Sequence, residues 1–139
     1  MPSFTKFNVF SSDLSKGNHK FGTDTFKVML TNTLPVVTNT VKANITEIAA
    51  ANGYTAGGPA ITMTVSSTGA VTKITGADTT ITATGAIATF RYAVIYNDTT
   101  ASPVKPLVCF IDYGTPITMA NGDTFVVDFD NTNGFTTVA

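Results

Sequence analysis

From residue 25 onward, apolar and polar side chains alternate along much of the chain, as they do in half-buried β-strands. The runs "TFKVMLTN" (residues 25–32) and "AITMTV" (residues 60–65) alternate in this way, and the second is expected to turn Ile61, Met63 and Val65 toward the core. Further runs, "VTKITG" and "TTITATG", are rich in threonine, which is β-branched and fits a strand. These patterns predict short strands.

Two longer runs are apolar at both odd and even positions. They are "FRYAVIYND" (residues 90–98) and "KPLVCFIDYG" (residues 105–114). A strand that is apolar on both faces is typical of the centre of a sheet that is covered from both sides. We therefore expect these two strands to be central and to lie next to each other.

A hairpin is predicted over "PITMANGDTFVVDFD" (residues 116–130), where Asn121-Gly122 separates two alternating runs and suits a type I′ turn. Phe125, Val127 and Phe129 would form its inward face. "GFTTVA" at residues 134–139 would add a last short strand. With about seven to nine short strands separated by turn residues, the fold class is all-β: a single-domain antiparallel β-sandwich, immunoglobulin-like or jelly-roll-like, over residues 25–139.

Two stretches do not alternate. Residues 45–51, "ITEIAAA", fit either a helical turn or extended chain. Residues 1–24 are predicted to be an N-terminal arm or short helical segment, either folded back on its own core or docked on a neighbouring subunit. Its apolar residues recur at three- and four-residue spacing, which would place them on one helical face: Phe4, Phe7, Phe10 and Leu14.

Composition points toward an assembly. The 139 residues include only 12% charged residues and carry a net charge of −1, and the eight basic residues are scattered singly. Without a basic patch we expect no nucleic-acid binding. No apolar run is long enough for a membrane helix, and "MPSFTKFNVF" lacks the pattern of a signal peptide, so we expect synthesis in the cytoplasm without membrane insertion. A near-neutral surface tends to associate.

Candidate chemistry is sparse, because the chain has one histidine and one cysteine. Nothing in the sequence places His19 beside Cys109, and Cys109 alternates as a core residue of a buried strand. Asp128 and Asp130 begin a stretch that resembles a calcium loop, but Thr132 stands at the third ligand position. We therefore expect no enzyme, no cofactor and no metal site.

The single arginine, Arg91, lies on one of the doubly apolar strands. A buried guanidinium must find a carboxylate or several carbonyls, and Asp112 and Glu47 are the candidate partners. A contact with another subunit is the alternative. The candidate subunit interface therefore comprises Phe4, Phe7, Phe10, Leu14 and Arg91.

Several stretches resemble small structural proteins of tailed-bacteriophage virions. They are "GNHKFGTDTFKVMLTNT" (17–33), "ITEIAAANGYTAGG" (45–58), "FRYAVIYNDT" (90–99), "FIDYG" (110–114) and "NGDTFVVDFDNTNG" (121–134). The resemblance implies a capsid decoration, or cement, protein on the capsid surface. Its partners would be the major capsid protein or other virion subunits and further copies of itself.

Two alternatives stay open beside capsid decoration. The protein would instead belong to the neck, tail or a fibre, or it would be a carbohydrate-binding module of the virion surface. Aromatic faces and amide side chains suit sugars, and the candidate residues for such a module are Tyr54, Tyr96 and Tyr113.

Overall fold

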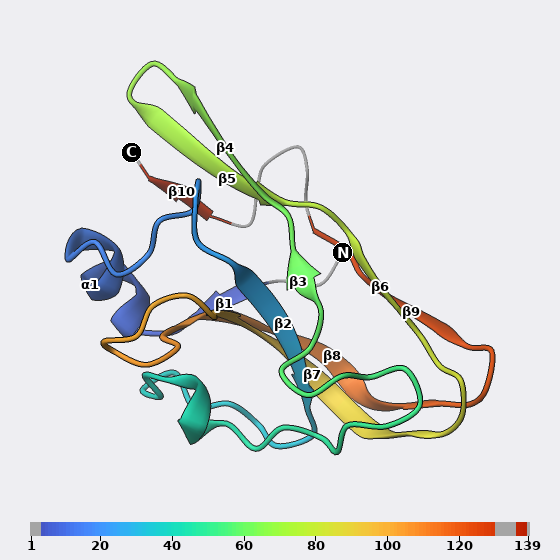
Figure 1. Cartoon of the computed structure of the whole chain (residues 1–139). Helices are drawn as coiled ribbons and strands as arrows, with labels where there is room; N and C mark the ends of the chain where they lie inside the picture. Colours follow the sequence, from blue (N-terminus) through green and yellow to red (C-terminus); the bar gives the residue numbers. More distant parts are fainter. Residues whose placement is uncertain (1–3, 130–135, 139) are drawn as a thin grey trace.

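A computed structural model describes residues 4–129 and 136–138 of the chain. Its largest element is a five-stranded antiparallel sheet in the order β1-β8-β7-β2-β3 (Figure 1). The strands of this sheet are β1 (Phe4–Lys6), β2 (Phe26–Thr31), β3 (Ala60–Ile61), β7 (Ile87–Asn97) and β8 (Leu107–Met119). The predicted central pair is confirmed, since β7 and β8 are neighbours.

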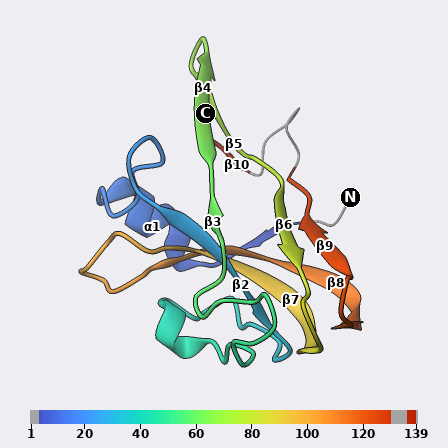
Figure 2. The ribbon, with the colours of Figure 1, turned by 45° about the vertical axis from the view of Figure 1, so that its right-hand side comes forward.

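A second layer covers one face of this sheet (Figures 1 and 2). It consists of a three-stranded ribbon in the order β10-β5-β4 and a two-stranded ribbon of β6 and β9. The strands of the two ribbons are β4 (Met63–Thr68), β5 (Val71–Gly76), β6 (Thr79–Thr82), β9 (Thr124–Val127) and β10 (Thr136–Val138). The prediction of an all-β, single-domain antiparallel fold is confirmed.

The main sheet has apolar side chains packed on both faces, which explains why β7 and β8 are apolar throughout. Toward the second layer, Ile95 packs in a large core with Ile81 and Val127. On the opposite face, Val94 and Tyr96 belong to a smaller separate core. Each face needs its own apolar set because side chains alternate across a strand.

Irregularities between β7 and β8 change which face two residues occupy. The pairing register shifts between Phe90 and Tyr92 and again between Ile95 and Tyr96. Phe90 consequently joins the large core with Ile95, and Leu107 joins the small core with Tyr96. Strict alternation would place Phe90 on the face of Tyr96 and Leu107 on the face of Cys109, but a register shift by an odd number of residues reverses the faces.

Residues 4–24 are packed against the sheet. Phe4 lies in β1, so the prediction that it shares a helical face with Phe7, Phe10 and Leu14 is wrong. Helix α1 (Val9–Ser15) follows β1. Phe7 packs in the small core and Phe10 in the large one. The segment is thus folded back on its own core, which was the first of the two interpretations.

The predicted hairpin between β8 and β9 is also different in the structure. β9 pairs with β6 in the second layer instead of with β8. The turn at Asn121-Gly122 is present, and the N–H of Asp123 donates to the carbonyl of Ala120 at 3.0 Å. Only Gly122 has positive φ, at 91°, which is typical of a type II turn rather than type I′. The chain therefore crosses between layers here.

Candidate interaction surface

The rare ionisable residues all make contacts within the fold. Arg91 forms two hydrogen bonds to Asp112: Nε donates to Oδ1 at 2.8 Å and a terminal nitrogen donates to Oδ2 at 3.1 Å. Asp112 was one of the two predicted partners. The arginine hydrogen bonds lower the pKa of Asp112, with help from the N–H of Gly114. Both side chains are partly exposed, so this pair contributes little to stability.

Glu47, the other candidate partner, instead anchors a loop. Its Oε2 accepts hydrogen bonds from the Tyr54 hydroxyl at 2.5 Å and the Gly57 N–H at 2.6 Å. Its Oε1 lies 3.3 Å from Nζ of Lys42. The Tyr54 hydroxyl also accepts from the Leu30 N–H at 3.0 Å, which ties the loop to β2. Burial, together with the bond to Glu47, raises the pKa of Tyr54.

His19 and Cys109 are both buried but make separate contacts. Nδ1 of His19 lies 3.3 Å from Nδ2 of Asn97, and its ring packs between those of Phe10, Phe21 and Phe26. Cys109 lies in β8 within the large core, where burial raises the pKa of its thiol. The expectation of a buried structural cysteine is confirmed.

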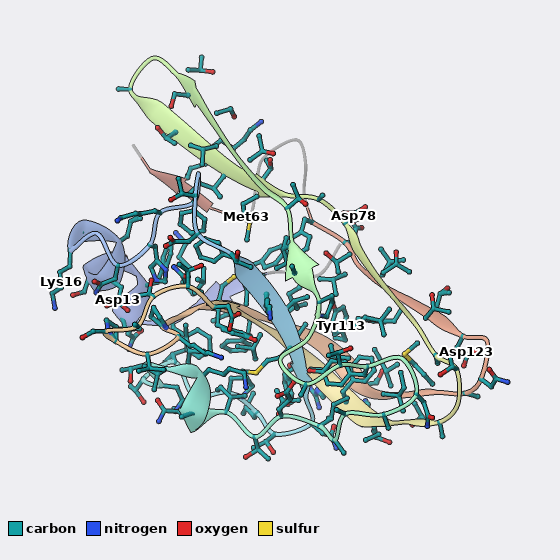
Figure 3. All side chains as sticks on the ribbon, viewed as in Figure 1. Asp13, Lys16, Met63, Asp78, Tyr113 and Asp123 are labelled. Atoms are coloured by element: carbon teal, nitrogen blue, oxygen red, sulfur yellow. The ribbon has the colours of Figure 1, made fainter. Side chains whose placement is uncertain are left out.

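Two of the three tyrosines proposed for sugar binding are buried, so the prediction that Tyr54 and Tyr96 are exposed is wrong, while Tyr113 is partly exposed. Tyr54 is 3% exposed and Tyr96 is fully buried. The Tyr96 hydroxyl donates to the carbonyl of Gly57 at 2.6 Å. Tyr113 packs edge-on against Phe125 between β8 and β9, with its hydroxyl buried (Figure 3). The alternation of apolar and polar residues predicts which face of a strand a tyrosine ring occupies. It does not predict whether a loop covers that face.

The predicted interface residues of the N-terminal segment are mostly occupied within the chain. Phe7 and Phe10 are each 2% exposed. Phe4 stacks on Phe129 with 5.7 Å between ring centres, and Leu14 packs against the large core while remaining partly exposed. Phe7 and Phe10 are therefore unavailable to a neighbouring subunit in this conformation.

Large apolar side chains instead reach solvent on two loops at one end of the main sheet. Leu34 is 59% exposed and Val104 is 63% exposed, and Val36 and Val37 are exposed beside Leu34. We call these four residues the loop surface. The only sequence signal for it was "TLPVVTNT", an apolar stretch in which Pro35 argues against a paired strand.

Backbone pairing brings the two loops of the loop surface together. Val41 and Pro106 form an antiparallel bridge, and the N–H of Lys42 donates to the carbonyl of Lys105 at 2.9 Å. The short 3₁₀ turn η1 (Lys42–Asn44) follows, and residues 46–50 form no regular secondary structure. In Figure 1 the two loops lie side by side at the lower left.

Asparagine side chains hold the first of these loops in shape. Oδ1 of Asn39 accepts from the Val36 N–H at 2.9 Å, and the Asn39 N–H donates back to the Val36 carbonyl at 2.8 Å. Oδ1 of Asn44 accepts from the N–H groups of Thr40 and Val41 at 3.0 and 3.2 Å. A loop braced in this way loses little entropy on binding, which favours affinity.

Two hollows flank η1 within the loop surface. One, of about 130 Å³, is lined by Leu34, Val36 and Ile45 among others. The other, of about 240 Å³, is lined by Val41, Lys42, Ala43, Val104 and Lys105. Both are small and lie on the surface, which suits protruding side chains of a partner protein.

The lysines around the loop surface are paired with carboxylates. Lys27 and Lys105 contact Asp98 at 3.2 and 3.0 Å, and Lys42 contacts Glu47. Burial by itself would raise the pKa of Asp98, but the hydrogen bonds from Lys105 and Lys27 outweigh it and lower that pKa. Three lysines thus share two carboxylates, and the loop surface presents apolar groups beside mostly paired charges.

Most residues of the calcium-like stretch that begins at Asp128, including Asp130, lie outside the described residues. Within residues 4–129 and 136–138, no group of three or more His, Cys, Asp or Glu side chains is arranged to hold a metal ion. Across the same ranges, no helix is long and apolar enough to span a membrane.

Comparison with known proteins identifies no relative. No protein-family model, curated protein or solved structure matches the chain. The expected immunoglobulin-like or jelly-roll-like connectivity, and the resemblance to phage virion proteins, thus stay predictions.

Proposed function

We propose that this protein is a non-enzymatic structural component of a tailed-phage virion that decorates and stabilises the capsid from its outer surface. The loop surface is the observation that carries the proposal, because it offers exposed apolar contacts on braced loops. The resemblance in sequence supplies the identity of the partner, the major capsid protein. The roles of Arg91, Glu47, His19 and Cys109 in folding contacts also suit a structural protein.

A physical argument links such a surface to shell stabilisation. A protein that binds only the mature lattice stabilises that lattice by mass action. Each contact can be modest, because many copies bind one shell and contact with more than one subunit raises avidity. Small apolar contacts on a near-neutral protein fit this role, since the net charge of −1 produces little repulsion between crowded copies.

The direct test adds purified protein to mature phage particles that lack it and images them by cryo-electron microscopy. We expect density at regular positions on the shell, with the loop surface toward the capsid. A shell that stays bare would contradict capsid decoration. Density at the neck, tail or a fibre would contradict it as well and would favour the other virion locations.

A pair of variants tests the loop surface itself. The first variant carries both Val36→Asp and Val104→Asp. It would bury two carboxylates in the contact with the capsid, so we expect capsid binding to weaken at least about tenfold relative to the wild-type protein. Val126→Asp is the control, because Val126 is also exposed, at 46%, but lies on β9 away from these loops. Equal binding by all three proteins would contradict the assignment, provided that melting temperatures show each variant to be folded.

Deleting the N-terminal segment is not an equivalent test. Residues 4–14 supply β1 and most of α1, and they place Phe7 and Phe10 in the two cores. Their removal would damage the fold and abolish binding for that reason alone.

The burial of Tyr54 and Tyr96 removes the exposed rings that favoured the alternative of carbohydrate binding.

A further inference from the structure

The hairpin of β4 and β5 projects from the body of the protein (Figures 1 and 2). β4 is the outermost strand of the ribbon β10-β5-β4, and no other described strand pairs with its free side. Met63 lies at the base of the hairpin, near the main sheet (Figure 3). From Thr64 to Thr68 every residue of β4 is exposed. The free edge of β4 is therefore accessible to another chain.

The hydrogen-bond pattern shows which backbone groups of β4 are free. The N–H of Ala77 donates to the carbonyl of Thr62 at 2.9 Å, so residues 62 and 77 form a hydrogen-bonded pair. In an antiparallel ladder such pairs alternate with pairs that are not hydrogen-bonded to each other. The N–H and C=O groups of Met63, Val65 and Ser67 consequently point away from β5.

The β4 edge lacks the features that usually prevent pairing between sheets. Its sequence, "MTVSST", contains no charged residue and no proline, and all of its pairs with β5 are in unbroken register. The edges of the main sheet differ: β1 has three residues and ends in Lys6, and β3 has only two residues. Natural edge strands are commonly short, charged or bulged for this reason.

We propose that β4 pairs with β4 of a second copy of this chain, antiparallel about a twofold axis that passes beside Val65. In this register Val65 lies opposite the partner subunit's Val65, and Met63 lies opposite the partner subunit's Ser67. It is the register in which all three outward-facing residues of β4 find hydrogen-bond partners. The two ribbons would then form one continuous six-stranded sheet, β10-β5-β4-β4-β5-β10.

Charge and burial favour a second copy as the occupant. A twofold axis places identical side chains opposite each other, which is unfavourable for charged strands and acceptable for this neutral one. Val65 shares a face with Ile74, and the two residues line a hollow of about 350 Å³ together with Leu14 and Phe21. Pairing would bring two such apolar faces together and cover part of Val65, which is 44% exposed in the single chain. This inference does not depend on attachment to a virion.

Disulfide trapping tests the register. In a hydrogen-bonded antiparallel pair the Cα atoms are about 5.5 Å apart, within the range that a disulfide bridges. The Val65→Cys protein should therefore form a covalent dimer on mild oxidation, seen on a non-reducing gel. The native Cys109 is buried and will not interfere. Ser66→Cys is the control, because the two Cys side chains would be offset by two residues, with Cα atoms beyond about 7 Å.

The two trapping results decide the proposal. Rapid linkage through position 65 and slow linkage through position 66 is the expected outcome. Preferential linkage through position 66 would move the axis by one residue and overturn the register. Linkage through neither position would overturn pairing through β4.

Sedimentation velocity tests the association without any cross-link. We expect a dimer for the wild-type protein, and at least about tenfold weaker association for Val65→Lys, because two ammonium groups would lie directly opposite each other. Val71→Lys is a matched control: Val71 is also 44% exposed and lies in the same hairpin, but on β5 and on the other face. A monomeric wild-type protein, or equal association of both variants, would overturn the proposal. Melting temperatures confirm that each variant is folded.

Discussion

His19 is the only histidine of the chain, and its buried surroundings determine which ring nitrogen carries the proton. Oδ1 of Asn97 accepts from the Thr99 N–H at 2.9 Å, so the amide nitrogen of Asn97 faces His19 and Nδ1 of the ring is the acceptor. The proton of the neutral ring is then on Nε2, which is buried and has no hydrogen-bond partner among the described residues. Burial lowers the pKa of His19, against the opposing effect of the Asp13 and Asp24 carboxylates.

This lowered pKa gives a sign to the pH dependence of stability. In the unfolded chain the pKa of His19 is about 6.5, and in the folded protein it is lower. At a pH between these two pKa values the unfolded chain binds more protons than the folded protein. We expect the melting temperature to fall as pH is lowered from about 7 to 5, because protonation of the unfolded state is favoured.

His19→Asn is the comparison for this prediction. Its side-chain oxygen can accept from Asn97 but does not titrate, so the melting temperature should depend less on pH than in the wild-type protein. An identical pH dependence in both proteins would show that other groups are responsible.

At the scale of elements, the loop over residues 45–59 is held on the main sheet by close backbone contact. A Cβ added to Gly58 would lie 1.7 Å from the carbonyl oxygen of Val28, and Gly58 has φ of +78°. Glu47 and Tyr54 fasten the same loop through side chains. The loop can lie this close to β2 only because a glycine stands at residue 58.

Gly58→Ala should therefore destabilise the protein by about 3 kcal/mol or more, through backbone strain and a clash with β2. Gly114→Ala is the control: its φ is +85°, but no atom of the described residues lies within 4 Å of an added Cβ, so it should lose only about 1–2 kcal/mol. Urea unfolding of both variants measures the difference. Equal losses would mean that the contact with Val28 relaxes easily.

At the scale of the whole molecule, the main sheet is enclosed between a large and a small core. Cys109 lies in the large core, 1% exposed, and burial raises the pKa of its thiol. Access to this thiol requires that the layers separate. Its reactivity thus reports opening of the entire fold rather than of a single loop.

We expect a thiol reagent at about pH 8 to leave native Cys109 unmodified and to react fully in denaturant. Val71→Cys, whose added thiol lies on the exposed hairpin and outside the proposed β4 contact, provides the positive control and should react at once. Fast modification of Cys109 in the native wild-type protein would show that the sheet opens locally.

Much of the local structure was predictable from sequence. The period-2 pattern identified β2, the doubly apolar pair β7 and β8, and the inward residues Val127 and Phe129. The Arg91–Asp112 pair was also among the predicted partners. Errors came where the pairing register shifts, as after Phe90, or where distant segments meet, as in the pairing of β9 with β6.

The sequence by itself determined that this chain forms strands, which of them are covered on both faces, and that its surface carries little charge, because these properties depend on local periodicity and composition. Only the tertiary structure decided what covers each face. It buried Tyr54 and Phe7 and left Val65 and Leu34 exposed. Periodicity defines the direction of a side chain, whereas burial depends on which distant segment packs there, and that is settled by the competition among all the apolar surfaces of the chain.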